Sequence, residues 1–247
     1  MTLSVQLFTA TSGSAPHPSV EVSVPSNFKI IGGGAIDNWS GQGNLLTASY
    51  PKGLNSWFAA GKDHEFPSPS TITAFAIALY DPNNEWDVVI KSETSNPAPH
   101  PQAIAVLPGN YTMTGGGAFV DYGSGVGNIL TASFPNSDKS WEVRSKDHDI
   151  ADSAQITAYA IGMRSRTGLA LQRIVVSATG VVAPHPTAHV ALPPGWILSG
   201  GGAFDNWEGA GNLLTASYPQ GMSWLAAGKD HKDPSPASVT AYAIGIR

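Results

Sequence analysis

The chain repeats one pattern of landmarks three times, and this triplication constrains its fold more than any other feature. A run of Gly-Gly-Gly-Ala begins at Gly32, Gly115 and Gly200. Around each run the same landmarks keep the same order: a His-Pro pair before it, then Gly-Asn, Ser-Trp, Lys-Asp-His and a Thr-Ala run after it. We therefore predict three tandem copies that fold as one cooperative domain. Their bounds are residues 1–81, 82–165 and 166–247.

The residues between the landmarks have the spacing of strands. Thr240, Tyr242, Ile244 and Ile246 alternate with small apolar residues, and a period of two is typical of a strand covered on both sides. No window has the period of a long amphipathic helix. We expect an all-β protein with about six strands in each copy of about 80 residues. The copies would form one pseudo-three-fold body; three packed small β-sandwiches are the alternative.

Composition excludes several classes of function. The formal net charge is −5 and no run of Lys or Arg is present, which argues against nucleic acid as a partner. The chain has no cysteine, and no stretch approaches about 18 consecutive apolar residues, so neither a disulfide nor membrane insertion is expected. The segment from Met1 to Val5 lacks a basic leader, so we expect a cytoplasmic or non-classically secreted protein.

The glycine runs and one set of tryptophans are assigned structural roles. Glycine inside a strand marks a bulge or the close approach of another backbone, whereas a phosphate cradle would require a helix after the glycines. The tryptophan of each Ser-Trp pair lies between predicted strands and is expected in the core. These residues are Trp57, Trp141 and Trp224.

The loop after each glycine run has the composition of a saccharide site. The first copy has Asp37, Asn38, Trp39 and Asn44, and the third has Asp205, Asn206, Trp207 and Asn212 in the same register. Carboxylate and amide groups bind sugar hydroxyls, and an indole can stack on the apolar face of a pyranose. The alternative is an Asx-turn whose tryptophan folds back as a lid on the core.

The loop of the second copy differs from the other two. It contains Asp121, Tyr122 and Asn128, with one extra residue before the acid and no tryptophan. Tyrosine offers a smaller stacking surface than indole, and a looser loop costs more to order on binding. We expect its site to be the weakest of up to three, leaving about two strong sites per chain.

The repeated Lys-Asp-His triplet is the second candidate element. Its members could complete the sugar site, or the Asp could cap turn amides while the His bonds a neighbouring copy. The triplets are Lys62-Asp63-His64, Lys146-Asp147-His148 and Lys229-Asp230-His231.

The histidine of each His-Pro pair has proline on both sides, which favours a structural role at the start of a strand. A metal site that pairs this histidine with the Lys-Asp-His triplet is the alternative, since His and Asp are plausible ligands. The sequence does not show that they converge, and we expect neither a metal nor another cofactor. The residues are His17, His100 and His185.

The order of Gly-Gly-Gly-Ala, loop, Ser-Tyr-Pro, Trp and Thr-Ala-Tyr-Ala resembles repeats of secreted actinobacterial proteins. More loosely, it is similar to the three-fold β-prism of vitelline membrane outer layer protein I and of jacalin-type lectins. The resemblance covers all three copies and implies a β-prism-like fold and a glycan-binding role. Two features depart from those families: cysteines are absent near Val24 and Ile77, and the copies have more strands than prism repeats.

These observations favour a multivalent carbohydrate-binding protein over an enzyme. No Gly-x-Ser-x-Gly or His-Glu-x-x-His motif is present, and three matching small sites are suited to avidity. Glycans or glycoconjugates are the expected partners, and homo-oligomer formation is left open. The alternatives are a cell-surface-binding toxin or defence protein, a glycan-processing enzyme, and a structural coat or storage protein.

Overall fold

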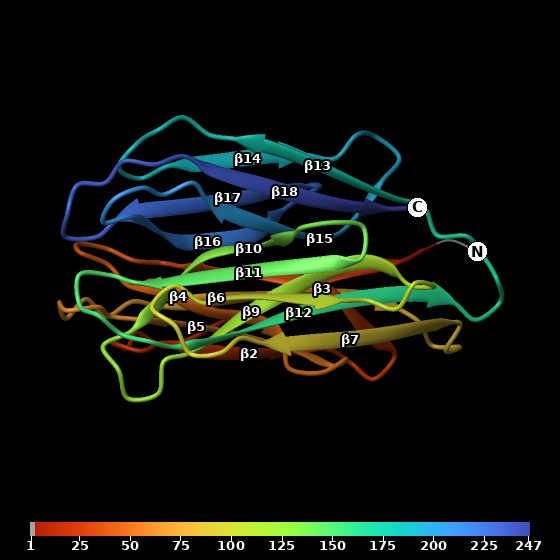
Figure 1. Cartoon of the computed structure of the whole chain (residues 1–247). Coiled ribbons are helices and arrows are strands. Elements are labelled where there is room, and N and C mark those ends of the chain that lie inside the picture. Colours follow the sequence, from red (N-terminus) through yellow and green to blue (C-terminus); the bar gives the residue numbers. More distant parts are fainter. Residues whose placement is uncertain (1–2) are drawn as a thin grey trace.

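The computed structural model describes residues 3–247 and contains only strands, turns and irregular segments there (Figure 1). Within residues 3–247, eighteen strands form three six-stranded sheets, which confirms the prediction of an all-β protein. Among the described residues, no helix has the length and apolar character that crossing a membrane would require.

The three sheets are antiparallel and have equivalent strand orders. Sheet I contains β1 (Val5–Thr11), β6 (Ile72–Tyr80), β3 (Phe28–Asp37), β16 (Asn212–Gln220), β17 (Ser223–Asp230) and β14 (Thr187–Ala191). Sheet II contains β7 (Trp86–Thr94), β12 (Gln155–Ser165), β9 (Thr112–Asp121), β4 (Leu45–Pro51), β5 (Ser56–Lys62) and β2 (Ser19–Ser23). Sheet III contains β13 (Arg173–Thr179), β18 (Val239–Ile246), β15 (Ile197–Asp205), β10 (Asn128–Pro135), β11 (Ser140–Asp147) and β8 (Gln102–Val106).

Every sheet combines strands from two thirds of the chain. Sheet I joins residues 1–81 to residues 166–247 through β3 and β16, where Ser217 lies opposite Ala35. Sheets II and III are joined in the same way through the pairs β4–β9 and β10–β15. In the part of the chain that the structure describes, no third completes a sheet from its own strands alone. This three-sheet arrangement is compatible with a pseudo-three-fold body.

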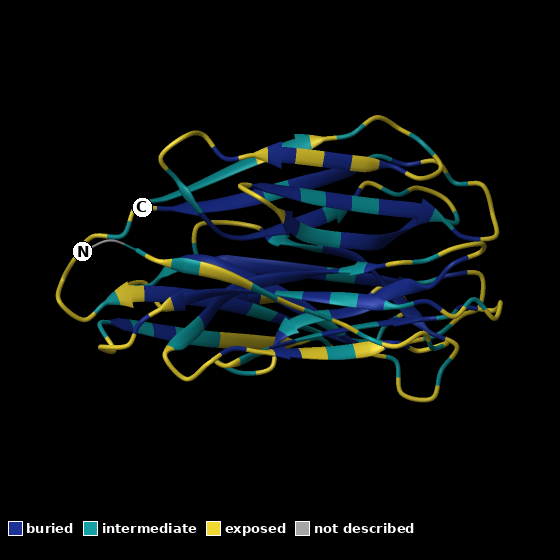
Figure 2. Cartoon of the chain, turned by 180° about the vertical axis from the view of Figure 1, so that it is seen from behind, coloured by how far each residue is buried: buried dark blue, intermediate teal, exposed yellow. Residues whose placement is uncertain are grey.

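The core lies where the sheets meet, and the expected tryptophans occupy it. Trp57, Trp141 and Trp224 are fully buried, and each indole Nε1 donates a hydrogen bond to a serine hydroxyl on the neighbouring strand. Alanines of the Thr-Ala runs face inward and are also fully buried. Figure 2 shows buried residues along the strands and exposed residues in the loops at both ends.

The glycine runs allow backbones to approach one another, as the sequence predicts. A Cβ atom on Gly32 would overlap the carbonyl oxygen of Ser199, and one on Gly115 would lie 2.8 Å from the Cα of Gly32. A Cβ atom on Gly201 would overlap the ring of Trp224. The first glycines therefore bring strands of different sheets together, and the second glycines make room for the core tryptophans.

The strand registers bring the candidate loops to one end of the body. Asp37, at the end of β3, pairs with Ile72 at the start of β6, and Thr11, at the end of β1, pairs with Thr73. The β1–β2, β3–β4 and β5–β6 loops therefore lie at the same end, and the equivalent loops of the other two thirds follow the same pattern. This end contains all of the residues that the sequence proposes as a site.

Candidate functional site

The aromatic side chain of each loop lies over a lysine from another third of the chain. All three rings are half-buried, which is intermediate between a free stacking surface and a lid on the core. A cation over an aromatic face is attracted by the ring's quadrupole. The distances between ring centroid and Nζ are 4.5 Å for Trp39 and Lys229, 4.4 Å for Trp207 and Lys146, and 4.4 Å for Tyr122 and Lys62.

The same lysines hold the aromatic loops through hydrogen bonds. Each Nζ is buried and donates to a backbone carbonyl near the end of the loop that it touches. Burial lowers the pKa of all three ammonium groups, to about 8 for Lys229. These lysines are buried and bonded to loop carbonyls, so they stabilise the loops and do not face solvent. The accepting residues are Val126, Ala210 and Gln42.

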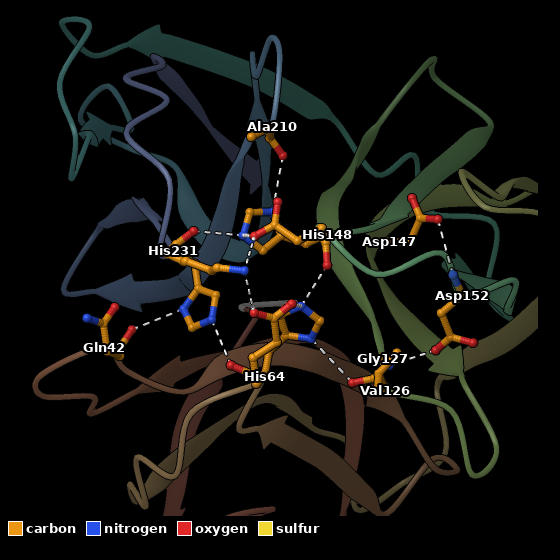
Figure 3. Close-up of polar contacts among 12 residues, drawn as sticks. Gln42, His64, Val126, Gly127, Asp147, His148, Asp152, Ala210 and His231 are labelled. Carbon is orange, nitrogen blue, oxygen red and sulfur yellow. Dashed lines mark hydrogen bonds and ion pairs between the residues drawn. The ribbon is translucent and has the colours of Figure 1, made fainter.

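The histidines of the three Lys-Asp-His triplets form a closed ring at the centre of this end (Figure 3). The Nε2 atom of His64 lies 2.8 Å from the carbonyl oxygen of His148, and that of His148 lies 2.7 Å from the carbonyl oxygen of His231. His231 closes the cycle on His64. The histidines therefore bond to neighbouring copies of the triplet, as one of the two interpretations of the sequence expects.

Burial favours the neutral form of two of these three imidazoles, those of His64 and His231. Desolvation lowers the pKa of His64 and lowers that of His231 to about 4. A neutral imidazole has one N–H, and the short Nε2 contacts assign that hydrogen to Nε2. Each Nδ1 atom then faces a loop carbonyl at 3.2–3.3 Å that a lysine ammonium already occupies. The ring is a structural centre, and all three side chains are closed to solvent.

Glu65, Asp149 and Lys232 follow the three histidines and form an ion-pair cluster beside the ring. Lys232 Nζ lies 2.9 Å from Glu65 and 3.5 Å from Asp149. All three residues have positive φ angles, of 60°, 58° and 65°. Among the described residues, no group of three or more His, Cys, Asp or Glu has the arrangement of a metal site.

Two of the predicted carboxylates are buried. Asp37 and Asp205 are 2% and 1% exposed, and desolvation raises their pKa values to about 7 and about 8. Asp37 accepts a hydrogen bond of 2.5 Å from Ser70, whereas both carboxylate oxygens of Asp205 lack a partner among the described residues. In the second third, Val120 occupies the strand register of these acids, and Asp121 lies one residue further on and is exposed.

The predicted asparagines divide into two groups. Asn44, Asn128 and Asn212 are fully buried, and their amides donate to the carbonyls of Pro16, Pro99 and Pro184, which precede the His-Pro pairs. Asn38 and Asn206 are exposed, and their amides bond to hydroxyls at the start of β6 and β18. Only the second group faces solvent.

The triplet aspartates are half-buried and connect loops. Asp63 accepts hydrogen bonds from Asn44 and from the backbone of Ser68, and Asp230 accepts one from Asn212. Asp147 accepts one of 3.2 Å from the backbone of Asp152. The capping of turn amides that the sequence allows is therefore observed for Asp63 and Asp147, whereas Asp230 binds the Asn212 side chain.

The histidines of the His-Pro pairs are the functional candidates that the sequence analysis assigned to a structural role. All three are exposed. The imidazole of His185 lies edge-on to Trp39 with ring centroids 5.2 Å apart, and that of His100 lies edge-on to Trp207 at 5.6 Å. His100 Nε2 also lies 3.1 Å from Asp147 Oδ1. Each of these pairs combines a surface histidine with the aromatic loop of a different third.

Two solvent-open clefts are each lined by a histidine of a His-Pro pair and a loop aromatic, His100 with Trp207 in one and His17 with Tyr122 in the other. The Trp207 cleft has a volume of about 310 Å³. It is lined by His100, Pro101, Gln102, Thr131, Arg144, Ser145, Phe204, Asp205, Asn206 and Trp207. The Tyr122 cleft has a volume of about 360 Å³. It is lined by His17, Ser19, Thr47, Phe58, Ala60, Gly61, Phe119, Val120, Asp121, Tyr122 and Gly123.

Each cleft is lined by residues from two different thirds of the chain. The residues that distinguish the second third therefore lie in two different clefts. Tyr122 replaces tryptophan opposite His17, whereas Arg144 lies opposite Trp207. The contact between Trp39 and His185 carries neither change. The residues that distinguish the second third therefore lie at two different junctions, and the expectation of about two strong sites and one weak site per chain stays a prediction.

Comparison with models of known protein families finds no match for this chain, and a search of curated proteins finds no similar sequence.

Proposed function

We propose that this protein is a multivalent carbohydrate-binding protein that acts by recognition without catalysis. Its body would be a β-prism-like assembly of three tandem repeats, residues 1–81, 82–165 and 166–247, with a binding site at each junction. The observation that supports the proposal most is the Trp207 cleft. There, an indole, a surface histidine and the amides of Asn206 and Gln102 surround an open volume of about 310 Å³.

The chemistry of this cleft is suited to a sugar. An aromatic ring covers the apolar face of a pyranose, and amide, imidazole and hydroxyl groups exchange hydrogen bonds with its hydroxyls. The cleft volume is at the lower end of the range of small-molecule sites, roughly 300–1,000 Å³. Small sites bind weakly one at a time, and several on one body increase the overall strength of binding to a surface that carries many glycans.

The proposal restricts the predicted site to residues that face the clefts. From the sequence analysis it keeps the exposed or half-buried loop residues and adds the three surface histidines. The buried lysines, the histidine ring and the buried asparagines support these residues from behind. The resulting set is Asn38, Trp39, Asp121, Tyr122, Asn206 and Trp207, together with His17, His100 and His185.

A glycan array with and without EDTA tests the proposal. We expect binding that is indifferent to EDTA and weakened in His100→Ala, because this imidazole faces Trp207 and is exposed. His189→Ala, a change at an exposed histidine outside both clefts, is the matched control. Absence of binding to any glycan would refute the proposal. Lysis of glycan-bearing cells or release of oligosaccharide products would favour the toxin or the enzyme instead.

A further inference from the structure

The Trp207 cleft contains a guanidinium that the equivalent positions elsewhere lack. Arg144, on β11, pairs in register with Gln102 on β8. The equivalent pairs are Ala60 with Ser19 on sheet II and Ala227 with Thr187 on sheet I. A residue with a long charged side chain therefore replaces alanine in one of three otherwise similar positions.

Arg144 is held in a fixed orientation. Its Nε and Nη2 atoms lie 2.6 Å and 2.5 Å from Oε1 of Glu142, and the amide of Gln102 donates to the same oxygen at 2.8 Å. The guanidinium carbon lies 5.2 Å from the ring centroid of Phe204. A guanidinium that is already oriented loses less conformational freedom when it binds a ligand.

The charges of this pair face different environments. The Glu142 side chain is 5% exposed, whereas that of Arg144 is 42% exposed and lines the cleft. Among the described residues, Nη1 of Arg144 has no hydrogen-bond partner. A ligand entering the cleft therefore meets the cation, with its counterion buried behind it.

Asp205, the other acid that lines the cleft, does not repel an anionic ligand. Asp205 is 1% exposed, and its pKa of about 8 leaves it largely protonated at neutral pH. Asp147, half-buried beside the cleft, is engaged by the imidazole of His100. The planar donor fork of arginine matches the oxygens of a carboxylate or a sulfate.

We infer that the Trp207 cleft binds a saccharide that carries a carboxylate or sulfate group, and that Arg144 determines this specificity. The Tyr122 cleft and the site between Trp39 and His185, with alanine at this position, bind neutral sugars. The inference rests on the proposed carbohydrate-binding function and names the ligand class of one of its sites.

The test uses titration calorimetry with three trisaccharides that share one linkage. One is built from galacturonic acid, one from sulfated galactose and one from unmodified galactose. The informative variant is Glu142→Leu with Arg144→Ala, because Leu225 and Ala227 occupy the same positions in the last third of the chain. Removing both partners leaves no buried unpaired carboxylate. Unchanged thermal unfolding confirms that this variant is folded.

For the wild-type protein we expect one site per chain that binds an acidic trisaccharide about five-fold more tightly than the neutral one, in keeping with a half-exposed ionic contact. High salt should reduce this preference, and the double variant should abolish it while neutral binding persists. The carboxylated and sulfated ligands distinguish which anion the fork prefers.

Two outcomes overturn the inference, and they are distinguishable from failure of the proposed function. If wild-type protein binds acidic and neutral trisaccharides equally, or the double variant keeps the preference, Arg144 does not determine specificity although the protein binds carbohydrate. The reciprocal variant, Leu225→Glu with Ala227→Arg, should add a second acidic site if the inference holds. If glycan arrays show no binding at all, the carbohydrate function itself fails.

Discussion

The Nε2 atom of His231 lies 2.7 Å from the backbone carbonyl oxygen of His64, although 167 residues separate them in the chain. This hydrogen bond closes the ring that His64 and His148 begin, so the three thirds of the chain are tied at one central point. Burial lowers the pKa values of His64 and His231, so these two imidazoles join the cycle in their neutral form, with the hydrogen on Nε2. The contribution of the ring to stability should therefore depend on pH.

Acid should weaken the histidine ring. The folded-state pKa of His231 is about 4, below the value of about 6.5 in an unfolded chain, so the unfolded state binds more protons between these values. The stability contributed by His231 is thus lost as pH falls from about 6.5 towards 4. Asp37 and Asp205 act in the opposite direction in this range, because their folded-state pKa values are raised.

We therefore expect a double variant, Asp37→Asn with Asp205→Asn, to reveal the contribution of His231 to the pH dependence of the free energy of unfolding. In this variant, the free energy of unfolding, measured by urea titration, should fall more steeply between pH 6.5 and pH 4 than in the wild-type protein. Adding His231→Gln should reduce the slope again. Identical slopes in all three proteins would show that the ring does not titrate as its burial implies.

Alkaline pH should expose the cost of the buried carboxylate of Asp205. The pKa of Asp205 is about 8 in the folded state and about 3.9 in the unfolded chain. The stability associated with the protonated carboxyl is therefore fully present below about pH 3.9 and is lost as pH rises through about 8. Each unit of difference corresponds to about 1.4 kcal/mol. Asp205→Asn should be more stable than the wild-type protein at pH 9 and show little benefit at pH 4, as measured by chemical denaturation.

The strand content could be predicted because a period of two is a local property. The repeated Thr-Ala runs, the core tryptophans and the close approach at the glycine runs all follow from residues next to one another in the sequence. The pairing of β3 with β16 could not be derived, since local periodicity does not specify which third completes a sheet. For the same reason, local periodicity could not predict the contact of Trp39 with Lys229, which come from different thirds of the chain.

The burial of Asp37 and Asp205 has a signal in the sequence. Both acids occur with a glycine before the Lys-Asp-His triplet, Gly61 or Gly228, and a Cβ atom there would lie 2.8–2.9 Å from the acid. Where Val120 replaces the acid, Ser145 replaces the glycine. This paired change indicates that the two positions share one small buried space. The exposure of His100 had no comparable signal, because flanking prolines fix the backbone and not the surroundings.

The second glycine of each run should tolerate no side chain. In Gly201→Ala, the new methyl group would overlap the ring of Trp224, which is fully buried and cannot move without displacing the core. Overpacking of this kind costs about 1–3 kcal/mol or more. Gly109→Ala is the matched control, because a Cβ atom there would have no neighbour within 4 Å. Thermal unfolding should show a large loss for the first variant and almost none for the second.

Cooperative unfolding is the last expectation, and it follows from the exchange of strands between thirds. Residues 1–81 contribute β1, β3 and β6 to sheet I and β2, β4 and β5 to sheet II, so neither half-sheet has its partner in an isolated fragment. Trp57 and its equivalents also belong to one continuous core.

We expect the full chain to unfold in one transition by calorimetry, with equal calorimetric and van't Hoff enthalpies. A fragment of residues 1–81 should be unfolded or associated when alone. Mixing it with residues 82–247 should restore native circular dichroism, because the missing strands are then supplied in trans. A monomeric, cooperatively folded fragment of residues 1–81 would contradict a body that the three thirds build jointly.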